Sequence, residues 1–270
     1  MTDPDLDGAL VGDFTGRTAV VTGAGQGIGA AIARGLAQHG AHVVLSGRHK
    51  STIEAVRATI DGDGGSAEAI VADVTDLKQL ERLMERAGGA DSVIDILINN
   101  AGIAGPTAAL VDVTLEDWNA TLSVNLTGVF LACKAALPYI AQAEHGRIVN
   151  IGSVTGKQPL PNRTPYAAAK LGVVGLTRTL AHELGPLGIS VNVVSPWLVG
   201  GDRLEAVIGT MAKELGVSAD ELRAEMTAGT AFKRTVTEAD VVATALFLCS
   251  PLAGNITGQD LNVSAGAVMY

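Results

Sequence analysis

Short apolar runs alternate with segments of helical periodicity along almost the whole chain. The runs are continuously apolar, which is typical of strands in a parallel sheet that is covered by helices on both faces. We predict strands at 18–22, 43–46, 69–72, 94–98, 147–151, 190–194 and 260–263. Between them, apolar residues at helical spacing predict helices, for example around 28–38 and 77–85.

Polar residues mark where several of these helices begin. Three pairs have the spacing of capping boxes: Ser51 with Glu54, Thr114 with Asp117, and Thr237 with Asp240. The second pair opens a long helix that is predicted to reach about Ala143. Alternation of strands and helices predicts an α/β fold, a single Rossmann-like doubly wound parallel sheet with helices on both faces.

The domain organisation follows from the same alternation. No linker, repeat or low-complexity segment interrupts it, so 13–270 is predicted to be one domain. The acidic residues 1–12 are predicted to form a flexible tail. Residues 200–235 are helical and charged and break the strand–helix order, as a lid over a substrate site or a surface decoration would; we predict a lid.

Composition narrows the class of protein. The formal net charge of −9 comes without a basic stripe, so we expect no binding of nucleic acid. No run of 18 apolar residues is present, so we expect no membrane span and a cytoplasmic location. Cys133 and Cys249 lie in apolar helical patterns and are predicted to be buried thiols rather than a disulfide. The five histidines lack metal-ligand spacing, so no metal is expected.

A glycine-rich turn follows the first strand and opens the first helix. It reads Thr22-Gly23-Ala24-Gly25-Gln26-Gly27-Ile28-Gly29. Glycines let the backbone turn sharply and approach a phosphate, and the helix N-terminus offers unpaired N–H groups to it. At this place in a doubly wound fold, the turn predicts a dinucleotide site rather than an ordinary tight turn.

The end of the second strand indicates which dinucleotide is bound. A carboxylate there would favour NAD(H), but Arg48 and Lys50 are cationic. We therefore predict that NADP(H) is preferred. NAD(H) stays possible, because Gln26 is neutral and Arg48 could equally stack on the adenine.

Tyr166 and Lys170 are the main candidates for chemistry. They are four residues apart on a helix that Thr164 is predicted to cap, with Pro165 as its first residue. That spacing places both side chains on one face, and a nearby cation favours the phenolate form of tyrosine. Tyr166 could then act as a general acid or base.

Five separated motifs agree in order and spacing with those of the short-chain dehydrogenase/reductase family, which the chain resembles over about residues 14–265. They are the glycine turn, Asn99-Asn100-Ala101-Gly102, Asn125, Ser153, and Tyr166 with Lys170. The resemblance implies an NAD(P)-dependent oxidoreductase that interconverts a secondary alcohol and a ketone. A dinucleotide-binding sensor that has lost catalysis is the alternative.

The resemblance also implies roles for individual residues. Tyr166 would be the acid/base, and Ser153 would hydrogen-bond the substrate oxygen. Lys170 would lower the pKa of Tyr166 and hold the nicotinamide ribose, and Asn125 would anchor a water that relays protons. The implied cofactor contacts are Gly23, Gln26, Gly27, Ile28, Gly29, Arg48, Asp73, Val74, Asn100, Gly102, Tyr166, Lys170 and Val199. A homotetramer through the helices near 115–143 and 164–185 is expected.

Some residues depart from the family pattern or suit more than one role. Trp197 stands where the family has glycine, and would either line the substrate pocket or pack beneath the lid. Gly152 stands where the family often has serine, a difference expected to be harmless. Asn162 and Arg163 could meet a polar substrate, but are expected to lie on the surface.

Overall fold

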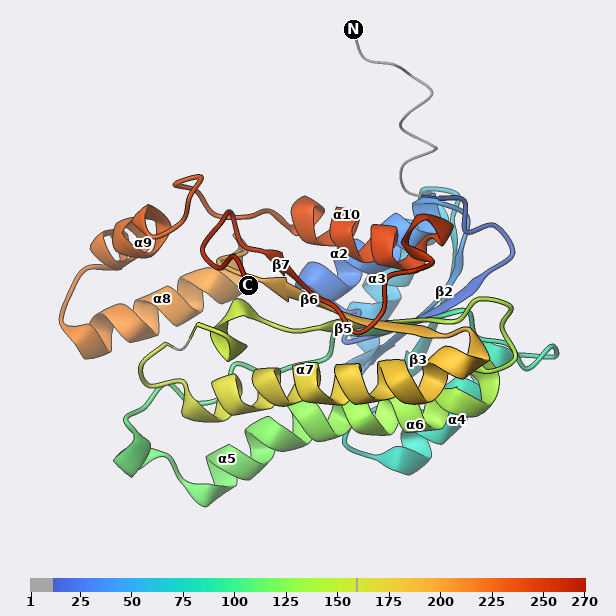
Figure 1. Cartoon of the computed structure of the whole chain (residues 1–270), viewed down its shortest axis with the longest axis horizontal. Coiled ribbons are helices and arrows are strands. Elements are labelled where there is room, and N and C mark those ends of the chain that lie inside the picture. Colours follow the sequence, from blue (N-terminus) through green and yellow to red (C-terminus); the bar gives the residue numbers. More distant parts are fainter. Residues whose placement is uncertain (1–11, 159) are drawn as a thin grey trace, which may run out of the picture.

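The computed structural model describes residues 12–158 and 160–270. The predicted tail therefore lies outside the described residues, except for Gly12. A seven-stranded sheet runs through the molecule in the order β3-β2-β1-β4-β5-β6-β7, and every pairing is parallel (Figure 1). The strands are β1 (Thr18–Thr22), β2 (His42–Gly47), β3 (Ser66–Val71), β4 (Ile96–Asn99), β5 (Arg147–Ile151), β6 (Ser190–Pro196) and β7 (Asp260–Val263). The predicted α/β fold is confirmed.

Helices cover both faces of the sheet (Figure 1). One face packs against α2 (Gly27–Gln38), α3 (Lys50–Gly62) and α10 (Glu238–Cys249), and the other against α4 (Leu77–Gly88), α6 (Gly128–Ile140) and α7 (Thr164–Leu184). Cys249 is buried in the first layer and Cys133 in the second, and neither forms a disulfide. Each apolar layer excludes water from one side of the sheet, as continuously apolar strands require.

Short 3₁₀-helical turns lie among these elements. They are η1 (Leu110–Asp112), η3 (Val154–Gly156), η4 (Gly185–Leu187) and η5 (Pro251–Ala253). The topology reverses direction at β1, which pairs with both β2 and β4. In an open parallel sheet, such a switch point places a crevice at the carboxyl ends of the strands, where ligands bind.

The helix starts were predicted with mixed success. Thr237 and Asp240 form the predicted capping box of α10. The capping box predicted for Ser51 and Glu54 is wrong, because α3 begins at Lys50 and Ser51 lies inside it. Glu54 is instead paired with Arg57 at 2.6 Å, one helical turn further along.

The long helix predicted from residue 114 is divided into three parts. Thr114 caps α5 (Leu115–Leu122), a π-helical segment η2 (Ser123–Thr127) follows, and α6 ends at Ile140 rather than near Ala143. By length and composition alone, Leu115–Ile140 could cross a membrane, with a window of mean hydropathy 1.5. Buried helices of a protein core have the same length and composition, and α6, the last part of this segment, packs against the sheet. The expected lack of a membrane span stays a prediction.

Residues 200–235 form a helical pair that follows β6 and projects away from the sheet, beyond the end of that strand (Figure 1). It consists of α8 (Asp202–Leu215) and α9 (Ala219–Ala228). Ile208, Met211 and Leu222 are buried between the two helices, and Arg223 of α9 pairs with Glu205 of α8. The pair thus has a small core of its own.

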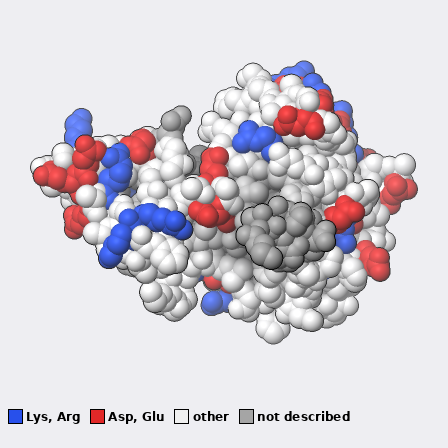
Figure 2. Space-filling model, turned by 90° about the horizontal axis from the view of Figure 1, so that it is seen from above, with Lys and Arg blue, Asp and Glu red and all other residues white. Residues whose placement is uncertain are grey.

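Charged side chains of both signs are scattered over the face shown in Figure 2. They do not gather into a basic surface there. That mixed pattern agrees with the lack of a basic stripe in the sequence. The absence of nucleic-acid binding stays a prediction.

Candidate functional site

Ser153 lies just beyond the carboxyl end of β5, at the edge where the crevice is expected. The turn η3 follows it directly and packs against α7: a Cβ added to Gly156 would lie 2.9 Å from the nitrogen of Leu171 and 3.1 Å from the carbonyl carbon of Lys170. The Ser153 hydroxyl accepts a hydrogen bond from the N–H of Thr155 at 3.2 Å. Close packing therefore fixes the Ser153 turn against the helix that carries Tyr166.

Lys170 joins that helix to the same strand end. Its Nζ donates to the carbonyl oxygen of Ile151 at 2.7 Å, and the residue is 5% exposed. The ammonium also lies 5.8 Å from the centre of the Tyr166 ring. The helix begins at Thr164 with Arg163 as its cap, one residue earlier than predicted. The structure thus brings Tyr166 and Lys170 together on the helix that packs against the turn after Ser153.

Asn125 lies in the π-helical segment η2 and is fully buried. Its Oδ1 accepts from the N–H of Ile103 at 2.8 Å, and its Nδ2 donates to the Ile103 carbonyl at 2.9 Å. A Cβ on Gly102 would lie 3.1 Å from that Oδ1. π-Helical turns are found often at functional sites, and this one fastens the loop after β4.

The glycine-rich turn is held by Asn100, which directly follows the neighbouring strand β4. The Asn100 side chain donates to the carbonyls of Thr22 at 3.2 Å and Gly23 at 3.0 Å. Gly23 adopts φ +64° and Gly27 φ +55°, which glycine tolerates best. A Cβ on Gly29 would lie 2.2 Å from Asn100 Nδ2. The turn has no room for a side chain at Gly29.

The N-terminus of α2 follows this turn. Gln26 caps it without a side-chain hydrogen bond and is exposed, as is Gly27, while Ile28 is half-buried. Side-chain capping therefore does not use the first N–H groups of α2. An accessible helix N-terminus behind a glycine turn fits the pyrophosphate of a dinucleotide.

The remaining predicted cofactor contacts lie at the ends of β2 and β3. Arg48 follows β2 and is exposed. The Asp73 carboxylate accepts from the N–H and hydroxyl of Thr75 at 2.9 and 2.8 Å. Val74 is buried against Gly128. The Asp73 carboxylate thus stabilises the turn that follows β3.

Trp197 is buried, with 7% of its surface exposed. It lies in an apolar cluster with Val154 and Val268, against which Leu204 of α8 also packs. Trp197 therefore packs against the segment 200–235, and a place in the wall of the substrate pocket stays a prediction. Val199 pairs with Val236 in an isolated parallel bridge, which ties the two ends of that segment together.

Gly152, which stands where the family often has serine, leaves no room for a side chain in this structure. An added Cβ would lie 2.5 Å from Val193 Cγ1 and 2.7 Å from Ser195 Oγ. Ser195 in turn donates to Asp260 at 2.6 Å, and Asp260 pairs with the largely buried Lys157 at 2.8 Å. Spacing along the chain gave no sign of this network, because its members come from three separate segments.

The expectation of a surface position was also wrong for Arg163, which is 5% exposed. Asn162 is half-buried, and its side-chain amide donates to Glu214 of α8 at 3.1 Å. Sequence could not indicate this burial, since the loop that covers Arg163 follows β4, more than fifty residues away in the chain.

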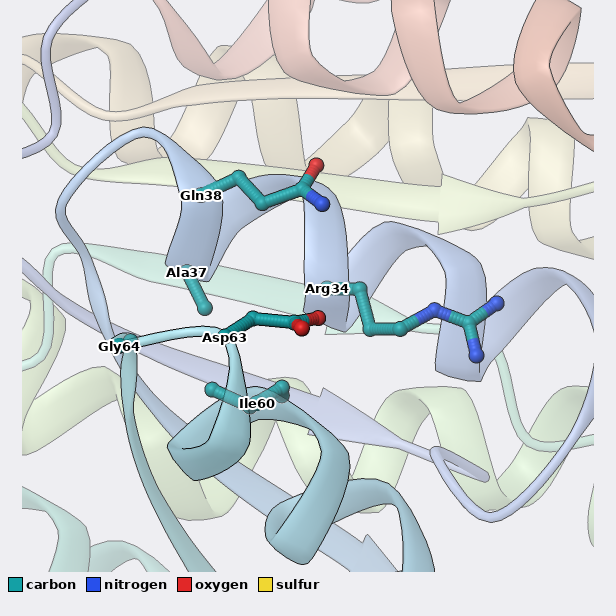
Figure 3. Close-up of a pocket in the computed structure, with 7 residues that line it drawn as sticks. Arg34, Ala37, Gln38, Ile60, Asp63 and Gly64 are labelled. Atoms are coloured by element: carbon teal, nitrogen blue, oxygen red, sulfur yellow. The ribbon is translucent and has the colours of Figure 1, made fainter.

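A separate cavity of about 100 Å³ lies between α2 and α3, close to their C-terminal ends (Figure 3). Its lining residues are Arg34, Ala37, Gln38, Ile60, Asp63, Gly64 and Gly65. None is a candidate site residue, so this cavity is distinct from the candidate site. Among residues 12–158 and 160–270, no three His, Cys, Asp or Glu side chains are grouped to hold a metal.

Comparison with known proteins shows the family of this chain. Residues 23–268 match the family model described as enoyl-(acyl carrier protein) reductase. The chain is 39% identical to the 3-oxoacyl-[acyl-carrier-protein] reductase of Synechocystis over 95% of this chain and 99% of that protein. It therefore belongs to the short-chain dehydrogenase/reductase family, and is an NAD(P)-dependent oxidoreductase.

Solved structures of the family superpose over nearly the full length. A variant of actinorhodin polyketide ketoreductase with NADPH is 34% identical, with a TM-score of 0.89 and coverage of 94% of this chain and 98% of that one. Xylitol dehydrogenase with NAD⁺ is 29% identical, with a TM-score of 0.90 and coverage of 94% and 99%. Relatives with the same fold thus differ in cofactor and substrate.

Proposed function

We propose that this protein is a ketoreductase that interconverts a secondary alcohol and a ketone, with NADP(H) as the preferred cofactor. The main support is the contact of Lys170 with the Ile151 carbonyl, since it fixes the Tyr166 helix against the strand that leads to Ser153. A nucleophile, acid or base is useful only when its partners are held in place, and these three residues are held by one turn and one helix.

In this proposal the nicotinamide supplies or accepts the hydride. Tyr166 gives a proton to the substrate oxygen in reduction and takes it back in oxidation, while Ser153 donates a hydrogen bond to that oxygen. Lys170 favours the phenolate form of Tyr166 through its charge. The side chain of Asn125 is engaged with Ile103, so we propose that its main-chain carbonyl anchors the water of the proton relay.

The cofactor would lie across the switch point, with its pyrophosphate on the turn 23–29. Asn100 and Gly102 would line the cleft, Asp73 and Val74 would lie near the adenine, and Val199 would meet the carboxamide. The exposed Arg48 after β2 supports a contact with a 2′-phosphate. The relative with NADPH supports this choice, while the relative with NAD⁺ keeps NAD(H) as the competing cofactor.

Replacing Arg48 by Asp should reverse the preference. A carboxylate accepts from the ribose 2′-hydroxyl and repels a 2′-phosphate, so we expect kcat/KM with NADPH to fall about tenfold or more and kcat/KM with NADH to hold or rise. Steady-state kinetics with both cofactors measures this. Equal loss with both cofactors would contradict a role of Arg48 in choosing between them.

The wild-type protein should first be tested with NADPH and NADH against 3-oxoacyl thioesters, sugars and cyclic ketones, by following absorbance of the reduced cofactor. Turnover of any ketone supports the proposal. Tight binding of cofactor without turnover on the whole panel would favour the non-catalytic sensor instead. The names of the relatives support testing 3-oxoacyl thioesters first in this panel, and polyols in the reverse direction with NADP⁺ and NAD⁺.

We further propose one domain over 13–270, a cytoplasmic location, and α8–α9 as a lid over the substrate. A homotetramer is proposed because apolar side chains are exposed on two of the covering helices: Phe130 on α6 is 46% exposed and Leu171 on α7 is 53% exposed. Light scattering that gave the mass of a monomer would contradict the tetramer.

A further inference from the structure

Arg163 lies immediately before α7, three residues before Tyr166, and is almost fully buried. Its guanidinium donates to three oxygens of one loop: Nη2 to the carbonyl of Ala104 at 2.8 Å, and Nη1 to Thr107 Oγ1 at 3.0 Å and to the carbonyl of Pro106 at 3.4 Å. A buried charge is costly unless it is hydrogen-bonded. The folded loop supplies those bonds.

The neighbouring residue, Asn162, also bonds to this loop. The carbonyl of Asn162 accepts from the N–H of Ala108 at 3.0 Å. Asn162 adopts φ +63°, a conformation that asparagine tolerates better than most residues. The loop 104–108, which follows β4, is thus bonded at four of its groups to the two residues that precede the Tyr166 helix.

The same guanidinium packs on Tyr166. Arg163 Cζ lies 4.8 Å from the centre of the phenol ring, within the range of a cation–π contact. Arginine suits this position because its planar fork can donate to several acceptors and still stack on a ring, which lysine cannot reproduce. The Arg163 side chain therefore contacts both residues 104–107 of this loop and the ring of the proposed acid/base.

We propose that Arg163 is a positioning residue: it uses the loop 104–107 as its support to hold the Tyr166 ring in the orientation needed for proton transfer. This inference rests on the proposed function, in which Tyr166 exchanges a proton with the substrate oxygen. Arg163 itself is assigned no contact with substrate. Arg163 is proposed to affect turnover only by fixing the orientation of the Tyr166 phenol and the conformation of the loop.

The test compares Arg163→Met, which keeps an unbranched apolar stem but removes the guanidinium, with Arg163→Lys and Thr107→Val. We expect Arg163→Met to lower kcat about tenfold to 100-fold, since small misplacements of reacting groups have effects of this size. The Kd for NADPH, from fluorescence titration, should change less than about twofold, well below the tenfold loss in kcat. The solvent deuterium isotope effect on kcat should rise, because proton transfer becomes slower.

Arg163→Lys should recover part of the lost kcat, and Thr107→Val, which removes one acceptor, should show a smaller loss in the same direction. Arg82→Met is the matched control: Arg82 is exposed on α4, and its loss should leave kcat unchanged. Unchanged kcat and isotope effect in Arg163→Met would overturn the proposal, as would an equal weakening of NADPH binding. Should Arg163→Met fail to fold, an unchanged kcat and isotope effect in Arg163→Lys would overturn it.

Hydrogen exchange separates this proposal from the proposed function. The peptide that spans 103–110 should exchange faster in Arg163→Met than in the wild type, whether or not a substrate is known. Wild-type protein without turnover on the panel would remove the proposed function. Unchanged exchange in this peptide would remove the support that the loop is proposed to give to Arg163.

Discussion

Replacing Tyr166 by Phe is expected to lower kcat by about 10²–10⁴-fold, the usual contribution of a positioned general acid or base. The substitution removes only the hydroxyl, so the ring keeps its contacts with Arg163 and Lys170. NADPH should still bind, because the turn 23–29 is untouched. Stopped-flow or steady-state absorbance gives kcat, and fluorescence titration gives the Kd for NADPH.

Tyr139→Phe is the matched control for this experiment. Tyr139 lies near the C-terminal end of α6 and packs against Gly88 of α4. Asn125 precedes the N-terminal end of α6, so Tyr139 is far from it along the helix. Its loss should leave kcat within about twofold of the wild type, small beside the factor expected at Tyr166. Equal activity of Tyr166→Phe and wild type would exclude Tyr166 as the acid/base and would direct attention to Ser153 and bound water.

A methyl group on Gly29 is expected to disrupt cofactor binding. In Gly29→Ala the new Cβ would lie 2.2 Å from Asn100 Nδ2 and 2.4 Å from the Gly23 carbonyl, so either the helix start or the turn must move. Such overpacking costs about 1–3 kcal/mol. The Kd for NADPH should rise at least about tenfold, since the displaced groups are those proposed to hold the pyrophosphate.

Calorimetry and fluorescence titration measure the two effects of Gly29→Ala separately. The Tm should fall by several degrees, roughly 2–4 °C for each kcal/mol in a chain of this size. Gly62→Ala is the control, because Gly62 ends α3 with nothing within 4 Å of an added Cβ. A wild-type Kd for NADPH in Gly29→Ala would contradict the proposed phosphate site.

Most of the fold could be predicted, because a parallel sheet imposes a strong local pattern. The strands Thr18–Thr22, Arg147–Ile151 and Asp260–Val263 have the predicted bounds. Each is a short segment with apolar residues at its centre or at alternate positions. Helix starts were less certain. The cap of α3 is His49, two residues before the predicted Ser51, which therefore lies inside the helix.

The chemistry-bearing residues of the site could be found from their spacing, but their supports could not. Tyr166 and Lys170 are one helical turn apart, so local geometry places them together. The burial of Arg163 and Trp197 depends on segments distant in the chain, and the π-helical turn at Asn125 has no signal in hydrophobic periodicity. Tertiary packing decided all three.

The positions of the two cysteines allow local opening of the fold to be followed by thiol labelling. Burial raises the pKa of Cys133 and of Cys249 to about 12, so that roughly one thiol in 10⁵ is ionised at pH 7. Cys133 is buried between the sheet and the helices α4, α6 and α7, and Cys249 is buried between the sheet and the helices α2, α3 and α10. Each thiol is therefore unreactive while the helices on its face of the sheet stay in place. A thiol reagent that reached Cys249 alone would report detachment of its layer while the other half stayed closed.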